Sequence, residues 1–226
     1  GYPYTSIAGY AGTGKSTLVT FIINALQLEP TEVAYAAYTG KAAMVLKQKG
    51  CQNAMTAHRL LYHTRQRADG TYIHVPKMSF DEPYQLIVVD EISMLPNKMW
   101  ELLLKHHIHV LALGDPGQLP PVAKDEDNHV LDNPHIFLDE IMRQEDGNEI
   151  INWSMHVRQG NPLYERDGQE VKVIEKYNAS FGMCKWADKI ICATNSTRDL
   201  LNNQMRSILM HAESRFPLEG DKIICL

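Results

Sequence analysis

The sequence has no surplus of positive charge. It carries 22 Lys and Arg residues against 27 Asp and Glu residues, for a formal net charge of −5. Proteins that bind nucleic-acid phosphates usually have a basic surplus, so a nucleic-acid site here must be a local groove or be completed by further sequence. No apolar run approaches about 18 residues, and the N-terminus lacks a basic segment followed by an apolar one. Neither a membrane span nor a secretion signal is indicated.

Cysteine is also scarce. The four cysteines are far apart and form no C-x-x-C pair: Cys51, Cys184, Cys192 and Cys225. This spacing favours free thiols and a cytoplasmic location over disulfides or a metal site. The chain has no repeat of fixed period, and its 226 residues, 44% of them hydrophobic, suffice for one large α/β domain or for one domain and part of a second. Because the final apolar run resembles a strand cut short, we expect a fragment of a longer protein.

Residues 9–16, GYAGTGKS, match the P-loop pattern GxxxxGK[S/T] at every fixed position. They follow a short apolar run, 4–8, and precede a segment with helical apolar spacing, 16–26. Glycines allow the tight turn in which backbone N–H groups and a helix N-terminus face phosphate oxygens. Lys15 is expected to hold the β- and γ-phosphates of ATP, and Ser16 to ligate Mg²⁺. The expected nucleotide contacts are Gly9, Ala11, Gly12, Thr13, Gly14, Lys15, Ser16 and Thr17.

Two apolar segments each end in acidic residues. Residues 85–91 read QLIVVDE and residues 109–115 read HVLALGD, as expected for strands buried on both faces of a parallel sheet. Ligands collect at the carboxyl edge of such sheets, so the P-loop and these acids are predicted to share one site. Asp90 is expected to hold Mg²⁺ and Glu91 to orient or deprotonate the attacking water. Asp115 and Gln118 suit either a γ-phosphate contact or a Pro/Gly turn that caps the strand.

The rest of the chain alternates between strand and helix patterns. The segment 64–83 is polar and β-prone around Asp69-Gly70, which fits either a hairpin or a surface loop. Thr56 is predicted to cap a short helix. Alternation resumes after Asp139, where we expect a second lobe to begin. Strands are predicted at 32–38, 171–174 and 189–193, and helices at 40–50, 97–105, 148–158 and 196–211.

Five motifs occur in the order and approximate spacing of the superfamily 1B DNA helicases: the P-loop, TGKAA (39–43), TAHRLL (56–61), VVDEISML (88–95) and GDPGQLPPV (114–122). The chain resembles the RecD and Dda branch of that family. The resemblance implies an α/β fold of the RecA-like P-loop class, with a parallel sheet flanked by helices. It places one complete ATPase lobe at residues 1–138, with a small hairpin insertion at about 64–83, and an incomplete second RecA-like lobe at 139–226.

The resemblance also implies roles for particular residues. Gln118 would sense the γ-phosphate, and Arg143 would act as an arginine finger from the second lobe. The family's hairpin is the pin that splits the duplex. Tyr38 stands where the family usually has Pro, and either base stacking or burial at a strand end fits it. The implied DNA contacts are Tyr38, Thr39, Gly40, Lys41, Thr56, His58 and Arg59.

The function implied is an ATP-dependent DNA helicase that translocates on single-stranded DNA with 5′ to 3′ polarity and unwinds duplexes. Single-stranded DNA and junctions of single and double strands are the expected partners, with further subunits of a recombination or repair complex as an option and no membrane. Two alternatives stay open. One is an AAA-class ATPase that remodels proteins, and the other is a nucleotide-switched DNA-binding module that does not turn over.

Overall fold

The computed structural model describes residues 3–122, 126–140, 148–210, 216–219 and 221. Contacts within the chain divide it into two compact units, Gly1–Asn148 and Glu149–Leu226, here called unit 1 and unit 2. The contact division falls ten residues after the lobe boundary predicted at residue 138, which stays a prediction.

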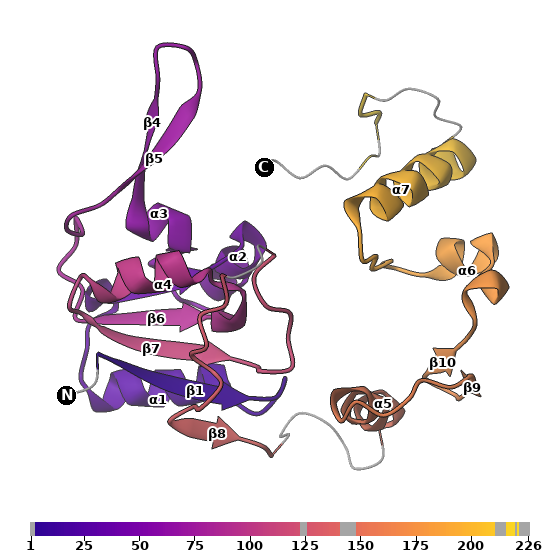
Figure 1. Ribbon diagram of the computed structural model, residues 1–226, viewed down its shortest axis with the longest axis horizontal. Coiled ribbons are helices and arrows are strands. Elements are labelled where there is room, and N and C mark those ends of the chain that lie inside the picture. Colours follow the sequence, from indigo (N-terminus) through magenta and orange to yellow (C-terminus); the bar gives the residue numbers. More distant parts are fainter. Residues whose placement is uncertain (1–2, 123–125, 141–147, 211–215, 220, 222–226) are drawn as a thin grey trace. The chain divides into compact units, whose positions relative to one another are not determined.

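Unit 1 is built on a six-stranded sheet with the order β3-β2-β6-β7-β1-β8 (Figure 1). Every neighbouring pair in it is parallel. The strands are β1 (Tyr4–Gly9), β2 (Val33–Ala37), β3 (Ala54–Thr56), β6 (Leu86–Asp90), β7 (His109–Gly114) and β8 (Ile136–Leu138). The four apolar residues of β6 are all buried, as expected for a central strand covered on both faces. The predicted fold class is confirmed.

Helices cover both faces of this sheet. α1 (Lys15–Ala25) packs on one face, where Val19 and Ile23 meet alternate residues of four strands. α3 (Ala57–Leu61) and α4 (Asn97–Leu104) pack on the other face, and Trp100 of α4 lies edge-on to Tyr4. α2 (Gly40–Gln48) buries Ala43 and Leu46 against β2 and β3. Short 3₁₀ turns lie at η1 (Pro30–Glu32) and η2 (Ile92–Met94).

A two-stranded antiparallel hairpin projects from unit 1 (Figure 1). It consists of β4 (Tyr62–Gln66) and β5 (Tyr72–Pro76). Gly70 adopts φ 84°, which favours glycine, and the Asp69 carboxylate accepts the backbone N–H of Thr71 at 2.9 Å. These turn features favour the hairpin. Of the two predicted alternatives for this segment, a hairpin and a surface loop, the structure contains the hairpin.

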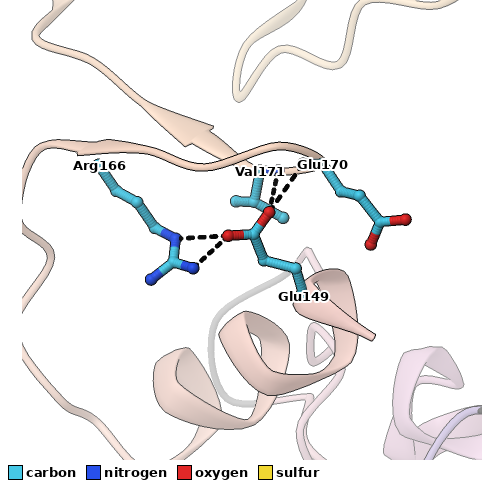
Figure 2. A network of polar contacts seen from close by, with 4 residues as sticks. All are labelled: Glu149, Arg166, Glu170 and Val171. Carbon is cyan, nitrogen blue, oxygen red and sulfur yellow. Dashed lines mark hydrogen bonds and ion pairs between the residues drawn. The ribbon is translucent and has the colours of Figure 1, made fainter. Parts of the chain in front are cut away.

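Unit 2 contains α5 (Glu149–Arg158), α6 (Phe181–Trp186), α7 (Asn195–Met210), the turn η3 (Lys176–Asn178) and a small antiparallel pair, β9 (Arg166–Asp167) and β10 (Lys172–Val173). A network of polar contacts joins α5 to that pair (Figure 2). The Glu149 carboxylate accepts hydrogen bonds from the Arg166 guanidinium and from the backbone N–H groups of Glu170, at 2.7 Å, and Val171, at 3.1 Å. These donors, Arg166 first, lower the pKa of Glu149 to about 2.

One strand prediction in unit 2 is wrong. Residues 189–193 lie in no strand, and Ile191 is 96% exposed. A strand needs a neighbour to take its backbone hydrogen bonds, and no described strand of unit 2 pairs with this segment. Across the described residues, no helix is long and apolar enough to cross a membrane.

Candidate functional site

The P-loop joins β1 to α1 at the carboxyl edge of the sheet. Gly12 and Gly14 both adopt φ 85°, and Gly14 is the N-cap of α1. At Gly9 the need for glycine is steric, because a Cβ there would lie 2.7 Å from Thr13 Oγ1 and 2.8 Å from the backbone oxygen of Leu138 in β8. The start of the loop at Gly9 is therefore packed closely between the Thr13 side chain and the edge strand β8.

The Lys15 ammonium is held over this loop. Its Nζ donates to the backbone oxygens of Gly9, at 2.6 Å, and Tyr10, at 2.8 Å, and Thr13 Oγ1 also donates to the Tyr10 oxygen. An ammonium group at hydrogen-bond distance from loop carbonyls can turn to phosphate oxygens bound in the same loop, since it offers three donors on a flexible stem. Lys15 therefore lies at the P-loop, and its role toward phosphates stays a prediction.

Asp90 and Glu91 lie at the carboxyl end of β6. In the sheet, β7 lies between β6 and β1, the strand that leads into the P-loop. Burial raises the pKa of Asp90, and burial together with the Asp90 charge raises the pKa of Glu91. The Lys15 charge acts in the opposite direction and lowers the pKa of both carboxyls. Gln118 contributes a hydrogen bond that lowers the pKa of Glu91. Four residues from three separate motifs therefore meet at one edge.

Asp115, at the end of β7, is only 1% exposed. Its carboxylate accepts the backbone N–H of Gly117 at 2.9 Å, and its backbone oxygen accepts the N–H of Gln118 at 3.0 Å. Asp115 therefore shapes the turn that carries Gln118 to Glu91. This geometry matches the strand-capping alternative for Asp115 and the active-site alternative for Gln118.

Ser16 and Asp90 both line a cavity of about 410 Å³ beside α1. A hydroxyl and a carboxylate are hard oxygen ligands of the kind that Mg²⁺ prefers, so the donor set fits the expected ion. Lys49, near the end of α2, lines the same cavity and lowers the pKa of Asp90. Lys49 could not be predicted from the sequence, because it belongs to no motif and reaches the site only through the packing of α2.

The residues proposed to contact DNA gather at the ends of β2 and β3, which are adjacent strands. Thr39 caps α2 by accepting the N–H of Ala42, and Thr56 caps α3 by accepting the N–H of Arg59, each at 3.2 Å. Gly40 and Lys41 form the first turn of α2. Both helix N-termini thus open onto the same edge, where backbone N–H groups can meet anions.

Aromatic rings line this edge. The rings of Tyr38, which is half-buried, and His58 have centroids 5.9 Å apart. His58 is in turn 6.0 Å from Tyr62 and 6.1 Å from His74, and these last two are 6.2 Å apart. Burial and the nearby His74 lower the pKa of His58. Tyr62 and His74 were not predicted as site residues, since only the fold of the hairpin brings them to His58.

Arg143, the expected arginine finger, lies outside the described residues, as does the rest of its motif.

The P-loop, the half-buried acid pair and the parallel strand order together define a P-loop nucleotide-binding protein. Residues 2–180 match a family model described as an AAA domain, and the chain belongs to that family, within its Pif1- and RecD-like superfamily 1B group. The resemblance read from the five motifs is confirmed.

Two curated relatives of this chain are longer than the chain itself. It is 33% identical over 156 residues to the ATP-dependent RecD2 DNA helicase of Deinococcus radiodurans, covering 67% of this chain and 21% of that protein. It is 26% identical over 247 residues to the ATP-dependent DNA helicase Dda of Enterobacteria phage T4, covering 98% of this chain and 56% of that protein. The chain therefore spans from a fifth to little more than half of these relatives.

The fold is also that of a solved helicase. The crystal structure of a Bacteroides Pif1 helicase in complex with ADP-AlF3 and single-stranded DNA matches with a TM-score of 0.53 at 19% identity. The match covers 91% of this chain and 53% of that one. At this identity the likeness establishes the RecA-like fold and leaves function to the site.

Proposed function

We propose that this chain belongs to the motor of an ATP-dependent DNA helicase that moves 5′ to 3′ on single-stranded DNA and unwinds duplexes. The observation that carries the proposal is the meeting of Lys15, Asp90, Glu91 and Gln118 at one sheet edge. The relatives named as ATP-dependent DNA helicases support it.

The P-loop residues bind the nucleotide in this proposal. Backbone N–H groups of residues 12–17 receive the phosphates, and Lys15 exchanges its two carbonyl acceptors for phosphate oxygens. Ser16 and Asp90 hold Mg²⁺, which when bound offsets the negative charge of the phosphates. Asp90, whose pKa is raised by burial, gains a counter-charge in that arrangement.

Glu91 accepts the proton of the attacking water. A carboxylate whose pKa is raised by burial and by a neighbouring acid is a better proton acceptor near neutral pH than an exposed one. Gln118, hydrogen-bonded to Glu91, keeps that side chain oriented and senses the γ-phosphate. Arg143 completes the site as an arginine finger in this proposal.

The DNA strand crosses the edge formed by Tyr38, residues 39–41 and the start of α3. Helix N-termini and Lys41 meet its phosphates, Tyr38 and His58 offer rings to its bases, and the hairpin β4–β5 separates the strands at a junction. Unit 2 forms the beginning of a second RecA-like lobe, whose movement against the first shifts the grip on DNA. Further subunits of a recombination or repair complex and a cytoplasmic location belong to the same proposal.

A strand-separation assay tests this function. The full-length protein is mixed with duplexes that carry either a 5′ or a 3′ single-stranded tail, with Glu91→Gln as the control. We expect ATP-dependent unwinding of the 5′-tailed duplex only, lost in the variant. ATP-dependent DNA binding without unwinding or turnover would instead indicate the nucleotide-switched module, and ATP turnover that ignores DNA would indicate the protein-remodelling class.

A further inference from the structure

The hairpin has two chemically different faces. In its register Tyr62 pairs with Pro76, Thr64 with His74 and Gln66 with Tyr72. Because side chains alternate along a strand and paired residues share a face, one face carries three rings: Tyr62, Tyr72 and His74. We call this the ring face. The other face carries His63, Arg65, Ile73 and Val75.

Two of the three rings on the ring face are exposed, and Tyr62 at its base is half-buried. Tyr72 is 66% exposed and His74 is also exposed, whereas Ile73 and Val75 are half-buried. Burying a large ring is ordinarily favourable, so a strand that hides its aliphatic residues and presents its rings to solvent is arranged for a ligand that stacks on rings.

The ring face continues the rings of the sheet edge. His58 contacts Tyr38 on one side and both Tyr62 and His74 on the other, with every centroid separation between 5.9 and 6.2 Å. These four rings therefore form a connected row that runs from the end of β2 onto the hairpin. Tyr72 lies on the same hairpin face, nearer the turn. A row of this kind suits a linear ligand with one planar group per unit.

We propose that the ring face stacks the bases of single-stranded DNA, so that the hairpin grips the strand as well as meeting the junction. The inference rests on the proposed function and extends it to Tyr62, Tyr72 and His74. Stacking on aromatic side chains is tolerant of sequence, since every base has a π-face.

The surrounding charge agrees with a nucleic-acid ligand. Residues 59–76 contain three arginines, Arg59, Arg65 and Arg67, and a single acid, Asp69, in a chain whose net charge is −5. This segment is therefore locally basic and attracts phosphates, and Arg65 lies on the hairpin face opposite the ring face. His58, with its pKa lowered by burial and by His74, remains a neutral ring near pH 7 and contributes stacking more than charge.

The test separates bases from phosphates. Binding of the full chain is measured by fluorescence anisotropy to a labelled oligodeoxythymidine and to an abasic oligomer of the same length. The variants are Tyr72→Leu and His74→Ala on the ring face, Tyr72→Phe, which keeps the ring, and His63→Ala, a matched histidine on the opposite face. Loss of one stacked ring weakens binding by about five- to 150-fold.

We expect Tyr72→Leu and His74→Ala each to weaken binding to oligodeoxythymidine within that range. Binding to the abasic oligomer is expected to stay within about twofold, and Tyr72→Phe and His63→Ala are expected to behave as the wild type with both ligands. Equal loss on both oligomers, or no loss on either, would overturn the inference while leaving the proposed function standing. A wild-type chain that binds neither oligomer, with or without nucleotide, would overturn the DNA part of the proposed function and the inference with it.

Discussion

Gly9→Ala is the perturbation whose effect follows most directly from the geometry of the P-loop. The added Cβ would lie 2.7 Å from Thr13 Oγ1 and 2.8 Å from the backbone oxygen of Leu138. The threonine side chain can rotate, but the Leu138 oxygen belongs to β8, which pairs with β1 at this point. Either β8 or the loop must therefore retreat by roughly half an ångström to regain ordinary contact.

Overpacking of this kind costs about 1–3 kcal/mol. In a chain of this size that corresponds to a fall in melting temperature of roughly 2–12 °C. The nucleotide response should fall as well, because the displaced carbonyl of residue 9 is one of the two acceptors that position Lys15.

Thermal unfolding with and without Mg²⁺ and ATP measures both effects. Gly40→Ala is the control, since a Cβ at Gly40 meets nothing within 4 Å and alanine favours the helix that begins there; its melting temperature should be unchanged or slightly higher. A Gly9→Ala protein with wild-type stability and a wild-type ATP response would refute the claim that β8 confines the P-loop.

Three further predictions concern charge and capping. Asp90→Asn should raise the melting temperature at pH 7 without nucleotide and abolish the stabilisation by Mg²⁺ and ATP. A carboxyl whose pKa is raised in the folded state stabilises the fold only at low pH, below its ordinary pKa of 3.8. This contribution is lost as the pH rises through the folded-state pKa, so at pH 7 the Asp90 carboxylate destabilises the fold. Thr56→Ala should cost about 1 kcal/mol by removing the cap of α3, with Thr56→Ser restoring most of it in the same melting experiment. Glu149→Gln should destabilise unit 2 at pH 7, but wild type and variant should converge as pH falls from 4.5 through about 2, because a lowered pKa stabilises above the unfolded value and is lost through the folded one. Fluorescence of Trp153, over which the Arg166 guanidinium lies at 5.5 Å, reports that loss, and a constant difference across the pH range would rule out the ion pair as its source.

Much of unit 1 could be predicted because its signals are local. The P-loop pattern, the runs ending in Asp90 and Asp115, and the cap at Thr56 each specify one element. Parallel strands end at a common edge, so the proximity of Lys15 and the acid pair followed from the sequence alone. β3 was not predicted, since its three residues are too few to show a period and depend on pairing with β2.

The failures have a tertiary cause. Residues 190–193 are apolar and begin with the β-branched pair Ile190 and Ile191, yet a strand forms only beside a partner, and sequence pattern does not reveal whether one is present. For the same reason the sequence could not connect Tyr62 and His74 to His58, or Lys49 to Asp90. Those contacts arise only when the hairpin and α2 pack against the sheet.

Steady-state ATP hydrolysis by the full-length protein, with and without single-stranded DNA, tests the central claim most directly. Lys15→Ala and Glu91→Gln serve as controls, because one removes the phosphate-binding ammonium and the other the proton acceptor. We predict hydrolysis that rises strongly with DNA and is lost in both variants. Hydrolysis of equal rate with and without DNA would contradict the account of a DNA-driven motor.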